Sequence, residues 1–157
     1  MSPRRGAQPA GAPTTSRRSE GVDGSVLTSL LEFAASMIDR SMTGIEWVVE
    51  AYGCAPDRLR DLATLQLLFA RMVDDLNLHS CQDGQWHEFP DSGGITGLSM
   101  LAESHLACHS FPEFGTLCLN LFCCRPRSDW DFSGQLSELF GARTVQVRRL
   151  DRPYGHD

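Results

Sequence analysis

The chain has 157 residues, an ordinary share of apolar residues and a formal net charge of -6. This length suits about one domain, and no apolar run approaches the roughly 20 residues that a membrane-spanning helix needs. The acidic balance argues against a nucleic-acid-binding face, which would require a basic patch. We therefore expect a small-molecule partner, and neither nucleic acid nor membrane.

Residues 1–24 are rich in Pro, Gly, Ala, Ser and Thr, with four scattered arginines. Such a segment buries too little apolar surface to offset its conformational entropy, so we expect a disordered tail. Two arginine pairs are a feature of export signals, but no hydrophobic region follows either of them. Residues 25–43 place apolar side chains at helical spacing, which predicts an amphipathic helical extension.

Three segments follow this extension. Ile45–Tyr52 alternates in a way that predicts a half-buried strand. Pro56 opens a predicted long helix that ends near Leu76 and has one apolar face. Residues 78–89 contain a turn-like Gln-Asp-Gly step and are interpreted as a weak strand.

The second half of the chain predicts more strands. Gly94–Glu103 and Leu106–Ser110 are two strands separated by a short turn, and Thr116–Cys124 is a third strand with leucines on one face.

A helix capped by Ser128 or Asp129 and ended by Gly141 should follow. Arg143–Leu150 closes the domain as a strand, and residues 153–157 should fray.

The order β-α-β-β-β-α-β predicts an α+β fold, with helices on one face of a mainly antiparallel sheet. The other face would then need a cover, which points to a homodimer.

Six cysteines raise the possibility of a disulfide framework or a zinc site. The chain is longer than a typical disulfide-dense module and has no secretory segment, so we expect reduced thiols and a cytoplasmic protein. No Cys-x-x-Cys pair is present, so no metal is expected.

Glu103, Ser104 and His105 form the centre of the chain, at the predicted turn. A serine beside a carboxylate and histidines suits serine chemistry, but the flanking glycines of a hydrolase nucleophile elbow are missing. We therefore interpret this step as a site of self-cleavage. A serine in a turn is more often only a turn residue, so Ser104 by itself would carry little weight.

Several motifs at fixed spacing resemble those of the prokaryotic S-adenosylmethionine decarboxylase proenzymes. They are Gly-Ile-Thr-Gly at 94–97, Leu-Ala-Glu-Ser-His at 101–105, Phe-Pro-Glu at 111–113, and the single residues His109 and Cys124. The resemblance covers roughly Gly44–Leu150, and we take residues 44–152 as the decarboxylase-like domain. It implies a dimeric αββα sandwich built from the predicted sheet.

The resemblance also implies chemistry. Ser104 would attack the carbonyl of Glu103, cut the chain between 103 and 104, and become a pyruvoyl group that binds substrate as a Schiff base. His109 would be the processing base, and Thr96 would supply a processing hydroxyl. Cys124 would be the proton donor during decarboxylation.

Two further residues are implied to bind S-adenosylmethionine: Glu113 at the ribose and Phe89 at the adenine. The product would be the aminopropyl donor for spermidine synthesis. His105 is predicted to be structural.

Three departures from the family pattern bear on the substrate: Phe111 in place of Trp, Asn120 in place of Asp, and Arg125 in place of Gly. They leave two alternatives open. One is a pyruvoyl-dependent ornithine or arginine decarboxylase on the same scaffold. The other is a catalytically silent paralogue that regulates an active partner.

Overall fold

The structure, a computed structural model, describes residues 43–154. The predicted tail, residues 1–24, lies outside the described residues, as does the helical extension except for its last residue. Residues 155–157 of the predicted frayed end lie outside them too. Among the described residues, no helix is long and apolar enough to cross a membrane.

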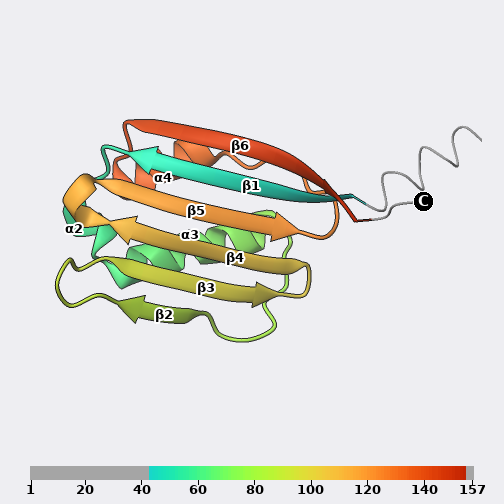
Figure 1. Cartoon of the computed structure of the whole chain (residues 1–157), viewed down its shortest axis with the longest axis horizontal. Coiled ribbons are helices and arrows are strands. Elements are labelled where there is room, and N and C mark those ends of the chain that lie inside the picture. The colour runs from blue at the N-terminus through green and yellow to red at the C-terminus, as the bar shows by residue number, and fades with distance from the viewer. Residues whose placement is uncertain (1–42, 155–157) are drawn as a thin grey trace, which may run out of the picture. The chain divides into compact units, whose positions relative to one another are not determined.

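Six antiparallel strands form one sheet in the order β2-β3-β4-β5-β1-β6 (Figure 1). Their bounds are β1 Thr43–Tyr52, β2 Gln85–Glu88, β3 Ile95–Leu101, β4 Ser104–Phe111, β5 Thr116–Cys123 and β6 Thr144–Pro153. A short 3-10 helix, η1 (Pro112–Phe114), joins β4 to β5. The predicted α+β fold with an antiparallel sheet is confirmed.

The predicted long helix is wrong in one respect, because it is divided into α2 (Pro56–Leu59) and α3 (Leu62–Asp75). Asp61 lies between them, and its carboxylate accepts hydrogen bonds from the first backbone N–H groups of α3. An aspartate that caps a new helix turns the chain at that point. The periodicity of the apolar residues continues across this break, which is why the sequence suggested one helix.

Helix α4 spans Phe132–Phe140, and its cap is Asp131 rather than the predicted Ser128 or Asp129. The Asp131 carboxylate accepts the N–H of Gly134 at 2.9 Å. The helix ends at Gly141 in the left-handed region, as predicted.

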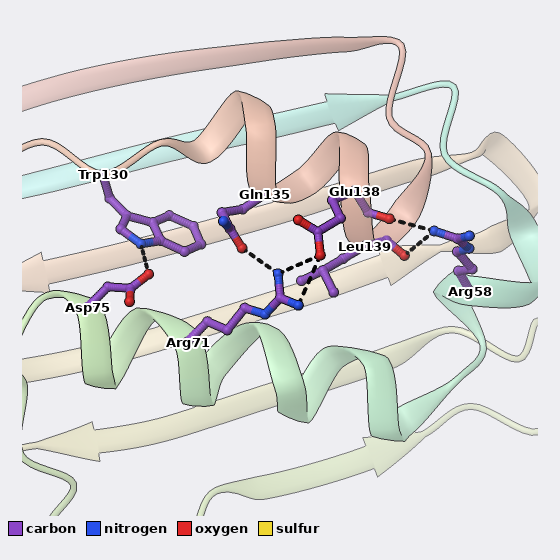
Figure 2. Close-up of polar contacts among 7 residues, drawn as sticks. All are labelled: Arg58, Arg71, Asp75, Trp130, Gln135, Glu138 and Leu139. Atoms are coloured by element: carbon purple, nitrogen blue, oxygen red, sulfur yellow. Dashed lines mark hydrogen bonds and ion pairs between the residues drawn. The ribbon is translucent and has the colours of Figure 1, made fainter.

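Both long helices lie behind the sheet in Figure 1, on one face. The core between the two layers contains alternate residues of every central strand, for example Trp47, Leu106 and Leu121. Polar contacts also tie α3 to α4, including the Arg71 ion pair with Glu138 at 3.0 Å (Figure 2). The opposite face of the sheet has no layer over it among the described residues.

The bounds of the central hairpin also differ from the prediction. The first strand ends at Leu101 and the second begins at Ser104, so only Ala102 and Glu103 form the turn. The weak strand predicted within 78–89 is the short edge strand β2, an additional strand relative to the predicted order. Strand β6 runs on to Pro153, which pairs with Thr43, so Pro153 belongs to the sheet.

Gly97 is required for the docking of β2, because Trp86 crosses directly over its Cα and packs on Phe69, with ring centroids 4.8 Å apart. A Cβ atom at Gly97 would lie 2.7 Å from two carbons of the indole. We predict that Gly97→Ala lowers the free energy of unfolding by about 1–3 kcal/mol, because overpacking displaces the ring. Chemical denaturation measures this change. Adding Trp86→Leu should recover part of the loss, and strictly additive effects would contradict the contact.

Candidate functional site

The tip of the β3–β4 hairpin places Ser104 in a strained backbone conformation. Leu101 pairs with Ser104, and Ser104 has a φ of 151°. Positive φ is sterically costly for a residue with a Cβ atom, and such strain is retained where surrounding contacts hold it in place. The bond that precedes this strained residue is the one predicted to be cut.

The Glu103 side chain is one of those contacts, since it is folded back and buried. Its carboxylate accepts the backbone N–H of His79 at 3.1 Å, contacts His79 Nδ1 at 2.8 Å, and pairs with Arg127 at 3.3 Å. Burial opposes ionisation of this carboxyl, but the hydrogen bonds from His79 outweigh burial and hold its pKa below the ordinary value. Glu103 is therefore an anchored carboxylate at neutral pH.

The Glu103 carbonyl is held separately, because its oxygen accepts the backbone N–H of Cys124 at 2.8 Å. The β4–β5 register places Ser104 opposite Cys123, so Cys124 follows directly beside the hairpin tip. The structure thus brings together three predicted site residues: Glu103, Ser104 and Cys124. An N–H group on this carbonyl would stabilise negative charge that develops on the oxygen.

Two other thiols of the sheet, Cys123 and Cys108, are more deeply buried than the thiol of Cys124. Burial raises the pKa of Cys123 to about 11 and that of Cys108 to about 12. Both are buried, whereas Cys124 is partly exposed. A buried thiol of high pKa is inert, so these two side chains pack in the core. All six cysteines are unpaired.

Thr96 and His109 form a second group, since they face each other directly across β3 and β4. Thr96 Oγ1 lies 2.6 Å from His109 Nδ1. The imidazole packs between Phe111 and Phe89, with ring centroids 4.3 and 5.4 Å away. Phe89, the predicted adenine-stacking residue, therefore lies beside the predicted base, and so does Phe111, one of the departures.

These two groups do not meet within one chain. His109 lies five residues along β4 from Ser104, which is about 17 Å at strand spacing. Glu113 is exposed on η1, beyond the His109 end of β4. The structure therefore brings Glu113 nearer to the Thr96 and His109 group than to the hairpin tip.

Some residues around the hairpin tip could not be identified from the sequence alone. His79 and Arg127 each lie 24 residues from Glu103 along the chain, so no local motif could have revealed their contacts. His105, predicted to be structural, lies against Ser104 Oγ and is hydrogen bonded to Asn120. Its position directly after Ser104 was the one available signal. Among residues 43–154, no His, Cys, Asp and Glu side chains gather as a group of three or more that could hold a metal ion.

A shallow hollow of about 300 Å³ lies on the uncovered sheet face, over β1, β4 and β5. Its walls come mainly from residues on that face, including Val48, Ala107, His109 and Cys118. The hollow adjoins the His109 group. No helix within residues 43–154 covers the face on which it lies.

Fold and site together are those of an α+β enzyme with a serine at the tip of a central hairpin. The family model for S-adenosylmethionine decarboxylase matches residues 45–153. The chain therefore belongs to the S-adenosylmethionine decarboxylase family.

Relatives include two bacterial proteins. The S-adenosylmethionine decarboxylase proenzyme of Carboxydothermus hydrogenoformans is 29% identical over 106 residues, which is 67% of this chain and 82% of the relative. The S-adenosylmethionine decarboxylase proenzyme 2 of Halalkalibacterium halodurans is 30% identical over 109 residues, 69% and 84% of the two chains.

The fold is similar to the crystal structure of the adenosylmethionine decarboxylase from Aquifex aeolicus. The TM-score is 0.59 at 18% sequence identity, over 74% of this chain and 95% of that one. At this identity the likeness supports the fold alone.

We predict that Glu103→Gln, made in an uncleavable Ser104→Ala chain, lowers the free energy of unfolding at pH 7 by about 1–3 kcal/mol. The amide loses the charge that His79 and Arg127 stabilise. Because the pKa of Glu103 is lowered by folding, its contribution is present above the ordinary glutamate pKa. That contribution should disappear as the pH falls through the lower folded value.

Denaturant unfolding at several pH values measures this difference. The matched control is Glu138→Gln, which removes an exposed ion pair and should change stability by less than about 0.5 kcal/mol. Equal effects of the two variants would show that the Glu103 contacts do not stabilise the hairpin.

Proposed function

We propose that this chain is a proenzyme that cuts itself between Glu103 and Ser104 and then decarboxylates S-adenosylmethionine. The observation that carries the proposal is the strained Ser104 beside a carbonyl on which Cys124 places an N–H donor. Family membership supports the same conclusion, since the matched relatives are named as proenzymes of this decarboxylase. The reaction class is carboxy-lyase.

The cleavage rearranges bonds that the chain itself contains. The Ser104 oxygen attacks the Glu103 carbonyl carbon, and the peptide C–N bond breaks to leave an ester and a free amine. Removal of the Ser104 α-proton then breaks the Ser104 Cβ–Oγ bond by β-elimination. The leaving group is the new main-chain carboxylate at the C-terminus of Glu103. Water hydrolyses the resulting enamine, by way of its imine form, to a pyruvoyl group and releases ammonia. His109 is the base for the α-proton.

The contact between Thr96 and His109 suits that role. If His109 Nδ1–H donates to Thr96 Oγ1, the imidazole keeps an unprotonated Nε2 that can accept a proton. The Thr96 hydroxyl hydrogen is then free to donate to an oxyanion. One 2.6 Å contact thus serves the base and the donor together.

The pyruvoyl group at position 104 would supply an electron sink for the electron pair that stays on the substrate α-carbon when carbon dioxide leaves. Cys124 lies beside this position in the same chain and would return a proton to the substrate α-carbon. Glu113 would accept hydrogen bonds from the ribose, and Phe89 would stack on the adenine. The product would serve polyamine synthesis, including that of spermidine.

A homodimer completes the site in this proposal. Leu98 and Met100 are 45% and 50% exposed on the sheet face that lacks a helix layer. Exposed apolar side chains beside a hollow are typical of an interaction surface. A second copy packed sheet to sheet and antiparallel would bring its Thr96, His109 and Glu113 to the Ser104 of the first.

The comparisons give no support to an ornithine or arginine decarboxylase, since the matched relatives are named for S-adenosylmethionine. A silent paralogue has no need of the site residues that this chain retains. The six unpaired cysteines support the proposed cytoplasmic location, because the cytosol keeps thiols reduced.

We predict that the purified protein consists of two fragments, residues 1–103 and 104–157, the second lacking its terminal ammonia. Intact mass spectrometry distinguishes this from simple hydrolysis. Ser104→Ala removes the nucleophile and should stay uncut. A single unbroken wild-type chain would refute the proposed self-cleavage.

We predict carbon dioxide release from S-adenosylmethionine and little or none from ornithine or arginine. Side-by-side assays with carboxyl-labelled substrates measure this. Glu113→Gln should raise KM about tenfold or more with a smaller change in kcat, because a hydrogen-bond acceptor for the ribose is lost. Equal or faster turnover of an amino acid without adenosine would transfer the function to the alternative.

A further inference from the structure

The Ser104 hydroxyl already has an imidazole of its own chain beside it. Ser104 Oγ lies 3.5 Å from His105 Nδ1. This distance is at the long end for a hydrogen bond, and such contacts commonly shorten as a reaction begins. By contrast, His109 of the same chain is about 17 Å away along β4. His79 is engaged with the Glu103 carboxylate.

A network that runs across four neighbouring strands, from β6 through β1 and β5 to β4, fixes the tautomer of His105. Arg152 pairs with Glu46, and Asn120 Nδ2 donates to Glu46 Oε1 at 2.8 Å. Because a carboxylate only accepts, the amide nitrogen must face Glu46, and Asn120 Oδ1 must face the other way. That oxygen lies 3.0 Å from His105 Nε2, which must therefore carry the hydrogen.

This assignment leaves the lone pair of the neutral imidazole on Nδ1, the atom that faces Ser104. Phe122 holds the ring from one side at a centroid distance of 5.8 Å. The charged groups linked to the ring through Asn120 are Glu46 on β1 and Arg152 on β6, and the titratable residue Cys124 directly follows β5. The opposite β3 residue is the uncharged Met100.

We propose that His105 is the base that activates Ser104 in the first step of self-cleavage, which rests on the self-cleavage proposed above. Nδ1 takes the hydroxyl proton as Oγ bonds to the Glu103 carbonyl carbon, and the Cys124 N–H stabilises the oxyanion. The peptide C–N bond breaks, and the proton passes from His105 to the Ser104 nitrogen. The products are the ester, a free amine and a neutral His105.

The work of cleavage is then divided between two histidines. His105 acts within its own chain and before the ester forms. His109 acts after the ester forms and, in the proposed dimer, from the second copy. The positioning residues are Asn120, Glu46 and Arg152. They keep the lone pair of His105 Nδ1 directed at Ser104 Oγ.

The test separates the two steps with hydroxylamine, which cuts esters but not peptide bonds. His105→Ala should slow cleavage about 100-fold or more and give an uncut chain that resists hydroxylamine. His109→Ala should give a chain that hydroxylamine cuts at position 103. Added imidazole should partly restore cleavage in His105→Ala, which loss of structure alone would not allow.

Two further variants test the role of His105 even if His105→Ala fails to fold. Asn120→Asp should move the acid limb of the pH–rate profile for cleavage to higher pH, because a carboxylate beside the ring stabilises the protonated imidazole, which cannot act as a base. Arg149→Ala is the matched control: it removes an arginine of β6 that pairs with Asp129 and Asp151 outside the network. This control should cleave normally.

Mixed dimers supply the remaining distinction. Co-expressed Ser104→Ala and His109→Ala chains should recover cleavage, whereas Ser104→Ala with His105→Ala should not, because the intact Ser104 would lack its own His105.

Cleavage of His105→Ala at the wild-type rate, or a hydroxylamine-sensitive ester in that variant, would overturn the role of His105 and leave self-cleavage standing. An uncut wild-type chain would overturn both.

Discussion

The fixed geometry of the Glu103–Ser104 peptide is the constraint on which the rest of the structure depends. Two residues form the turn between β3 and β4, and the polar groups of Glu103 are held from both sides. Its carboxylate is bound by His79 and Arg127, and its carbonyl is bound by the N–H of Cys124. These contacts stabilise a positive φ at Ser104 that a free hairpin would relieve.

The antiparallel ladder converts this local geometry into a site. Register between β4 and β5 sets Cys123 opposite Ser104, and this places the Cys124 N–H against the Glu103 carbonyl. Register between β3 and β4 sets Thr96 opposite His109. A shift of one residue in either ladder would turn these side chains to the opposite face, so site and register are inseparable.

The separation of these two groups along β4 has a functional meaning. Because Ser104 and His109 lie on the same rigid strand, the two groups cannot meet within one chain, and the proposed mechanism takes the second group from a second copy. The uncovered face with its hollow is suited to a second copy. In the mechanism proposed here, the network from Arg152 to His105 positions the base for Ser104 within one chain. The first bond rearrangement would then be local to each chain, and the later proton removal would need the proposed dimer.

The sequence by itself determined the α+β class, the alternation of β1 and β5, and the family motifs around Ser104, because periodicity and motif spacing are local properties of the chain. It missed the break at Asp61, since the apolar periodicity continues across that residue. It also missed the cap at Asp131, since backbone geometry decides which of several neighbouring polar residues caps a helix. Only the tertiary structure decided that Asn120 lies between Glu46 and His105 and that His79 and Arg127 enclose Glu103. Those contacts join distant segments through strand order and register, which no local pattern encodes.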